Sequence, residues 1–72
     1  MLIGKRIEMT PRIMHGKPVI KGTRIPVGLI LGYLSGGMTL DEILGEYPTL
    51  TREDVLACLE YASCIVDSEG GV

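Results

Sequence analysis

The sequence has no Trp and no Phe, and three tyrosines are its only aromatic residues. Its core must therefore be built mainly from aliphatic side chains. No apolar run is long enough to cross a bilayer as a helix, and the first residues lack the apolar segment of a secretion signal. We expect a cytoplasmic, single-domain protein without a membrane segment.

Cysteine and histidine are also scarce. Cys58 and Cys64 are six residues apart in a predicted helix, on roughly opposite faces and about 9 Å apart along its axis, too far for a disulfide. No His or Cys nearby completes a metal set, so we expect two buried, reduced cysteines and no metal or cofactor. His15 is the only histidine, and no nucleophile with an acidic partner accompanies it. The sequence therefore suggests no catalytic residues and predicts a protein that is not an enzyme.

Charge is divided unevenly between the two halves of the chain. Residues 1–36 contain six Lys or Arg and one acid, a net charge of +5, whereas residues 37–72 contain one Arg and eight acids, a net charge of −7. This asymmetry is typical of interaction proteins with an anionic partner for one half and a cationic partner for the other. It is equally compatible with a head-to-tail dimer.

The segment from Gly16 to Val27 contains three of the seven basic residues and two of the four prolines. Gly22 separates two short apolar runs, where a chain reversal needs a residue that tolerates positive φ. The Thr23 hydroxyl is suited to bonding turn backbone, and Pro26 stands where a helix begins. The pattern predicts a tight turn that leads directly into a helix.

The cations around this turn suit an anionic partner. The candidate residues for binding a partner or nucleic acid are Lys17, Lys21, Gly22, Thr23 and Arg24. The alternative is a structural hairpin whose charges keep a sheet edge soluble. Nucleotide binding is not expected, because the spacing G-x5-G-T lacks the Lys-Ser/Thr pair of a phosphate loop.

The first 26 residues predict a small β-element rather than a full sheet. Residues 6–10 alternate between polar and apolar until Pro11, which indicates one short strand. Val19–Ile20 and Arg24–Ile25 predict two more extended pieces around the turn.

The first helix is predicted from apolar residues at i, i+3, i+4 and i+7, namely Val27, Ile30, Leu31 and Leu34. Gly36-Gly37 ends it. Gly28 and Gly32 each cost about 1 kcal/mol relative to Ala inside a helix, so we expect close packing at these positions.

Two further helix starts share one pattern. Thr39 is a predicted N-cap with Glu42 three residues later, and Pro48 stops the helix that follows. Thr51 is the second N-cap, with Glu53 and Asp54 at the positive end of a third helix. Apolar residues before and after each cap form predicted staples, the pairs Met38/Ile43 and Leu50/Val55.

The third helix, from Arg52 to about Val66, is too apolar for one buried face. We expect its core face to consist of Val55, Leu59, Ala62 and Val66. The remaining apolar residues then need cover from another chain, so we predict a homo-oligomer whose interface includes Leu56, Tyr61 and Ile65. The tail from Asp67 to Val72 is expected to fray.

The second and third helices, with a short connection between them, match helix-turn-helix spacing. The first turn of the third helix, where that motif reads DNA, carries Glu53 and Asp54 beside only one Arg52. Phosphates repel such a helix end, so the basic turn is the better candidate for binding phosphate.

The segment Gly16–Val27 is followed by Gly37-Met38-Thr39, by Glu42-Ile43 and by matches at Tyr47-Pro48 and Leu59-Tyr61-Ala62. With these residues the chain resembles, from about Ile7 to Ala62, the family named domain of unknown function four-three-three. The resemblance implies a mainly α, homeodomain-like or winged-helix-like domain with three helices, a helix-turn-helix and a small N-terminal β-element. We divide the single domain 1–72 into a β-element with the basic turn (1–26), three helices (27–66) and a tail (67–72).

Genes of this family often lie beside a gene for a PIN-like nuclease. The resemblance therefore implies an antitoxin that neutralises a PIN-like ribonuclease toxin in a VapBC-like module and regulates its own operon through DNA. The alternative is a stand-alone DNA-binding regulator without a toxin partner.

Overall fold

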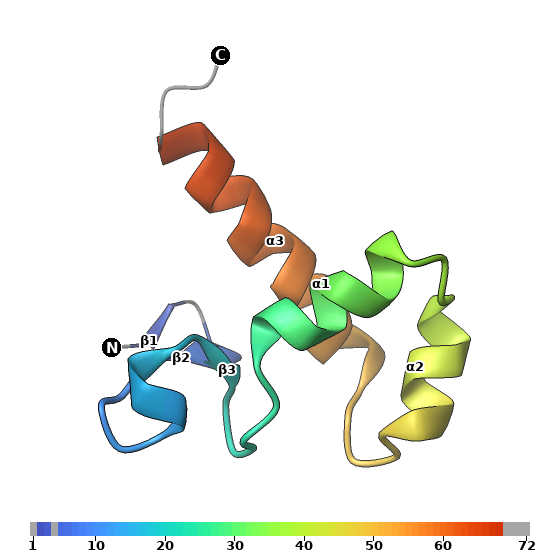
Figure 1. Ribbon diagram of the computed structural model, residues 1–72, viewed down its shortest axis with the longest axis horizontal. Helices are drawn as coiled ribbons and strands as arrows, with labels where there is room; N and C mark the ends of the chain where they lie inside the picture. Colours follow the sequence, from blue (N-terminus) through green and yellow to red (C-terminus); the bar gives the residue numbers. More distant parts are fainter. Residues whose placement is uncertain (1, 4, 69–72) are drawn as a thin grey trace.

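The computed structural model describes residues 2, 3 and 5–68 (Figure 1). Strands β1 (Leu2–Ile3), β2 (Ile7–Glu8) and β3 (Val19–Ile20) precede three helices, with a 3-10 turn, η1 (Met14–Gly16), before β3. The helices are α1 (Val27–Ser35), α2 (Leu40–Glu46) and α3 (Arg52–Ser68). The predicted fold, mainly α with a small N-terminal β-element, is confirmed.

The three strands form one antiparallel sheet in the order β1-β2-β3, with Ile7 opposite both Ile3 and Ile20. The sequence predicted β2 and β3 but not β1, because Leu2–Ile3 lies outside the alternation at residues 6–10 that indicated a strand. Arg24–Ile25 is not a strand, contrary to expectation. The chain there makes a single bridge, between Val19 and Pro26, and the Ile25 N–H that would extend the ladder donates to Thr23 Oγ1 instead.

The end of α1 is a Schellman motif. Gly37 has a φ of +99° and donates its N–H to Leu34 O at 3.1 Å, and Met38 donates to Tyr33 O at 3.0 Å. These bonds satisfy carbonyl groups that the end of the helix leaves unpaired. The predicted stop at Gly36-Gly37 is confirmed.

Both predicted N-caps form. The Glu42 N–H donates to Thr39 Oγ1 at 3.1 Å, and the Thr39 N–H donates to Glu42 Oε1 at 2.8 Å. Thr51 and Asp54 make the same reciprocal pair at 3.2 and 3.0 Å. Each capping box satisfies two N–H groups at a helix start, so α2 and α3 begin where the sequence predicted.

The core lies where the sheet, α1, α2 and the first half of α3 meet. Its buried residues are Ile7, Ile20, Val27, Ile30, Ile43, Leu50, Val55 and Cys58. All but one are aliphatic, as expected from a chain without Phe or Trp. The hydroxyls of Tyr33 and Tyr47, 3.1 Å apart, join α1 to the end of α2 at the edge of this core.

Two of the four residues predicted for the core face of α3 are exposed, so this prediction is wrong for them. Val55 is buried and Ala62 half-buried, but Leu59 and Val66 are 45% and 62% exposed, and Cys58 is buried instead. Cys64 is exposed, so the expectation of two buried cysteines holds only for Cys58. The reason is that α1, α2 and β2 pack against the side of α3 that carries Val55 and Cys58.

The expected close packing at Gly28 and Gly32 is also wrong. Both glycines are exposed, and a Cβ atom at either position would meet no atom within 4 Å. Nothing within the described chain requires a glycine at these two sites.

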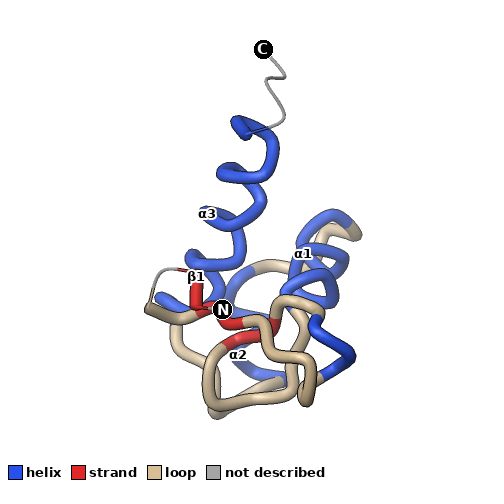
Figure 2. Tube along the Cα trace, turned by 90° about the vertical axis from the view of Figure 1, so that its left-hand side faces the viewer, coloured by secondary structure: helices blue, strands red, loops and turns tan. Residues whose placement is uncertain are grey.

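The last turns of α3 extend beyond the body of the fold (Figures 1 and 2). We call residues 63–68 the distal end of α3, and every side chain from Ser63 to Asp67 is exposed. Asp67 and Ser68, expected to belong to a frayed tail, are helical. The rest of that predicted tail, 69–72, lies outside the described residues.

Candidate partner-binding surfaces

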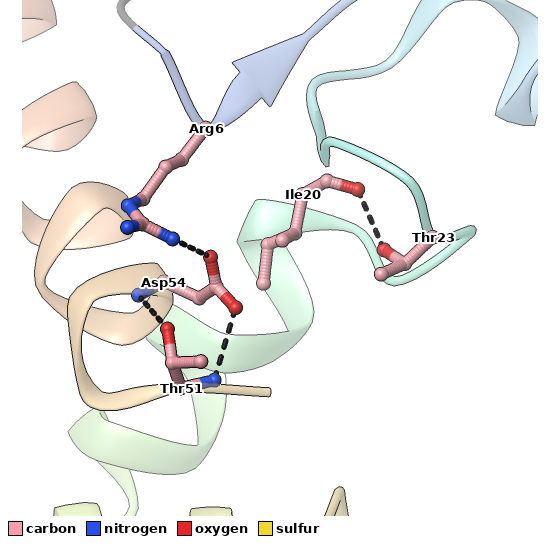
Figure 3. Close-up of polar contacts among 5 residues, drawn as sticks. All are labelled: Arg6, Ile20, Thr23, Thr51 and Asp54. Atoms are coloured by element: carbon pink, nitrogen blue, oxygen red, sulfur yellow. Dashed lines mark hydrogen bonds and ion pairs between the residues drawn. The ribbon is translucent and has the colours of Figure 1, made fainter. Parts of the chain in front are cut away.

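The first candidate surface is the basic turn, the residues Lys17, Lys21, Gly22, Thr23 and Arg24. Gly22 has a φ of +80°, as the chain reversal requires. Thr23 Oγ1 donates to Ile20 O at 2.7 Å (Figure 3) and accepts the Ile25 N–H at 2.9 Å. The Ile20 N–H donates to Ile25 O at 3.0 Å and closes the hairpin. The predicted turn and the predicted role of Thr23 in it are confirmed.

The turn is tied to the core on one side and open to solvent on the other. Val19 and Ile20, which precede it, are fully buried, whereas Lys21 and Arg24 are exposed. Neither cation forms a salt bridge with any residue that the structure describes. The hairpin therefore presents two cations on a defined backbone.

Lys17 stands apart from the tip of the turn. It follows η1, in which Met14 and His15 have positive φ angles of 51° and 57°. Its neighbours in a shallow surface hollow are Pro18, Pro26, Gly28 and the 39% exposed Leu29. The structure thus places Lys17 beside α1, at the base of the hairpin.

One ion pair joins the basic and acidic halves within the chain. Arg6 Nη1 lies 3.0 Å from Asp54 Oδ1, in the capping box of α3 (Figure 3). Burial on its own raises the pKa of Asp54, but hydrogen bonds from Thr51 and Arg6 and the Arg6 charge outweigh it and hold the pKa below its ordinary value. Asp54 therefore anchors β2 to the start of α3 and is not a free acid.

The second candidate surface is a groove of about 500 Å³ between β2 and α3, which we call the α3 groove. Its wall on the strand side consists of Lys5, Arg6 and Ile7. Its α3 side consists of Glu53, Leu56, Ala57, Glu60, Tyr61 and Cys64. An apolar floor between charged rims is typical of a site for an amphipathic partner.

The structure brings together two of the three residues predicted for a dimer interface. Leu56, 47% exposed, and Tyr61, half-buried against the core, both line the α3 groove. Ile65 does not line it but is 39% exposed at the distal end.

The sequence did not point to Lys5, Arg6 and Glu60, which line the α3 groove together with Leu56 and Tyr61. Arg6 and Asp54 are 48 positions apart, and no local pattern relates them. The seven-residue spacing of Glu53, Glu60 and Asp67 was a readable signal, because residues seven apart lie on one side of a helix.

Two features of the described residues bear on metal binding and on thiol reactivity. No three of their His, Cys, Asp and Glu side chains are placed to hold a metal ion together. Burial raises the pKa of the Cys58 thiol to about 11, and the nearby Asp54 adds to this, so Cys58 is a poor nucleophile. No described helix is both long enough and apolar enough to span a membrane.

Comparisons with known proteins agree with the predicted resemblance. Residues 7–62 match the model of a family described as a protein of unknown function, DUF433. A crystal structure of a DUF433 member from Anabaena variabilis superposes with a TM-score of 0.80 at 35% identity, covering 92% of this chain and 68% of that one.

An uncharacterised protein, y4eO of Sinorhizobium fredii, is 30% identical over 56 residues. The match covers 78% of this chain but only 25% of that relative, so this chain corresponds to about a quarter of the relative's length. With the family model covering more than half of the sequence, the chain belongs to the DUF433 family.

Proposed function

We propose that the protein is a non-catalytic antitoxin that binds and neutralises a PIN-like ribonuclease toxin in the cytoplasm. The observation that carries this proposal is the basic turn, a hydrogen-bonded hairpin that presents Lys21 and Arg24 without acidic partners in the described chain. Nucleases of this class bind metal and RNA through clustered carboxylates. An Arg or Lys inserted among those carboxylates forms charge-assisted hydrogen bonds and blocks the site.

Rigidity of the turn supports this role. Four hydrogen bonds around Thr23 and Ile20 fix the loop backbone before a partner binds, so less conformational entropy is lost on docking. A hairpin needed only for structure requires Gly22 and Thr23 but not two exposed cations at its tip.

Regulation of its own operon is the DNA-binding part of the proposal, and a stand-alone DNA-binding regulator is the alternative function. The short connection between α2 and α3 is typical of helix-turn-helix proteins, so it favours DNA binding in both cases. The first turn of α3 disfavours direct readout by that helix, because Glu53 is exposed and Asp54 is committed to its cap. DNA would therefore meet the basic turn.

The test replaces Lys21 and Arg24 by Ala and measures binding to a PIN-like nuclease from the same genome and to operator DNA. A matched control, Arg12→Ala with Arg52→Ala, removes two exposed cations outside the turn. We expect the turn variant to lose nuclease binding and the control to keep it. If DNA is also bound through the turn, the slope of log affinity against log salt falls by about 0.9 for each phosphate that the variant no longer neutralises. Equal binding of the nuclease by both variants would contradict the proposal.

A further inference from the structure

The 3-10 turn η1 has an unusual backbone. Met14, His15 and Gly16 have consecutive positive φ angles of 51°, 57° and 83°. Glycine adopts such left-handed conformations without steric penalty, whereas they are uncommon for a long side chain such as that of Met14. Two successive residues other than glycine in this conformation therefore place strain in the backbone of the turn.

Burial in the core does not compensate for this strain. No residue of η1 is buried, Met14 is 37% exposed, and His15 is exposed. Neither side chain belongs to the cluster of residues that forms the core. Strained backbone is characteristic of sites where a function requires one particular geometry, so the turn is a candidate for such a site.

Main-chain hydrogen bonds hold the turn in its left-handed conformation. The Gly16 N–H donates to Ile13 O at 3.0 Å. The Lys17 N–H donates to Met14 O at 3.2 Å. Shortly after the turn, β3 pairs with β2 and so fastens the end of the loop to the sheet. The backbone that carries His15 and Lys17 is thus fixed before any partner binds.

The loop is cationic and has no acid of its own. Between Glu8 and Asp41 the sequence contains four Lys or Arg and no Asp or Glu. His15 and Lys17 are both exposed, and neither forms a salt bridge with a residue of the described part of the chain. Carboxylates that bind these two side chains must therefore come from another molecule.

The turn lies within reach of the partner proposed for the basic turn. An extended chain spans at most about 3.5 Å per residue, so the Cα atoms of Lys17 and Lys21 are no more than about 14 Å apart. An interface that covers about 800 Å² on each partner is roughly 30 Å across. One partner can therefore contact both turns at once.

We propose that His15 is a contact residue for the same acidic partner, and that the left-handed turn Met14–Gly16 positions His15 and Lys17 for its carboxylates. This inference rests on the proposed function and extends its binding surface from the basic turn to η1. The His15 imidazole donates a hydrogen bond to one carboxylate, and the Lys17 ammonium donates a charge-assisted one. Met14 is a positioning residue, because it acts through the conformation of its backbone.

The test uses calorimetry to measure the affinity of the full chain for a PIN-like nuclease from the same genome. Lys17→Ala should weaken binding about two- to tenfold, because one hydrogen bond across the interface is lost. His15→Asp should weaken it at least about tenfold, because Asp tolerates the left-handed conformation but sets a like charge against the partner's carboxylates. The matched control is Arg12→Ala, the same change of one charge on an exposed residue of the loop without a positive φ, and it should leave the affinity unchanged.

Two substitutions of Met14 separate positioning from a merely structural role. Asn adopts the left-handed conformation readily, whereas β-branched Val disfavours it, so only Met14→Val displaces the turn. Both variants keep the side chains of His15 and Lys17. We expect Met14→Asn to stay within about twofold of the wild-type affinity and Met14→Val to lose as much as Lys17→Ala, while both keep their helical circular dichroism.

The possible results distinguish this inference from the proposed function. Wild-type affinity in His15→Asp and Lys17→Ala, with binding still lost in Lys21→Ala/Arg24→Ala, overturns the inference and leaves the antitoxin role in place. Equal affinities of Met14→Asn and Met14→Val overturn the positioning role of the turn. A folded wild-type chain that does not bind the nuclease overturns both the inference and the proposed function.

Discussion

Asp54 offers the most direct test of how the two charged halves are joined. It accepts hydrogen bonds from the Thr51 N–H and from Arg6, both at 3.0 Å. Asp54→Asn weakens both interactions. The capping bond contributes about 0.5–1.5 kcal/mol and the ion pair, whose Arg6 side chain is 45% exposed, about 0.2–1 kcal/mol. We expect a loss of about 0.7–2.5 kcal/mol in the free energy of unfolding at pH 7.

The lowered pKa of Asp54 determines how this loss of stability varies with pH. The pKa of Asp54 is lowered in the folded protein, so its carboxylate stabilises the fold at pH values above the pKa of the unfolded chain, about 3.9. That stability is lost as the pH falls through the lower pKa of the folded state. The difference between wild type and Asp54→Asn should therefore be largest above about pH 5 and shrink as the pH approaches 2.

The assay is urea unfolding followed by circular dichroism, at one protein concentration because association adds to stability. Arg6→Met removes only the ion pair and should cost less than Asp54→Asn. The reasoning is refuted if Asp54→Asn unfolds at the wild-type midpoint, or if its deficit is the same at pH 7 and pH 2.5.

Three further predictions rest on single positions. Gly22→Ala should destabilise the fold by about 1–2 kcal/mol in urea unfolding, because its φ of +80° is strained for Ala. Gly28→Ala and Gly32→Ala should each stabilise it by about 0.5–1 kcal/mol in the same assay, because both sites are open; a loss of stability instead would show that a partner packs there. In a thiol-labelling assay on the native protein, exposed Cys64 should react promptly and Cys58 only after unfolding, since Cys58 is buried and its pKa is raised to about 11; equal rates would contradict the packing of α3.

Local signals made much of the fold predictable. The caps at Thr39 and Thr51, the stop at Gly36-Gly37 and the turn at Gly22 each depend on residues within a few positions of one another. Their chemistry is therefore readable from the sequence alone. For the same reason the basic turn was predicted together with the bonding of Thr23 to turn backbone.

The orientation of α3 was not predictable in the same way. Apolar residues occur on several sides of it, so periodicity does not select one buried face. The approach of α1 and β2 selects Cys58 over Leu59, and that is a property of the tertiary arrangement. Likewise the α3 groove depends on β2 lying beside α3, which brings Arg6 to Asp54 across 48 positions.

Inhibition of RNA cleavage tests the proposed antitoxin role most directly. A PIN-like nuclease from the same genome is titrated with the wild-type chain and with the Lys21→Ala/Arg24→Ala variant, and cleavage of a labelled RNA is followed over time. We expect the wild type to abolish cleavage near stoichiometric amounts and the variant to leave it largely intact. Full cleavage in the presence of excess folded wild-type protein, or equal inhibition by the variant, would contradict the proposed role of the basic turn.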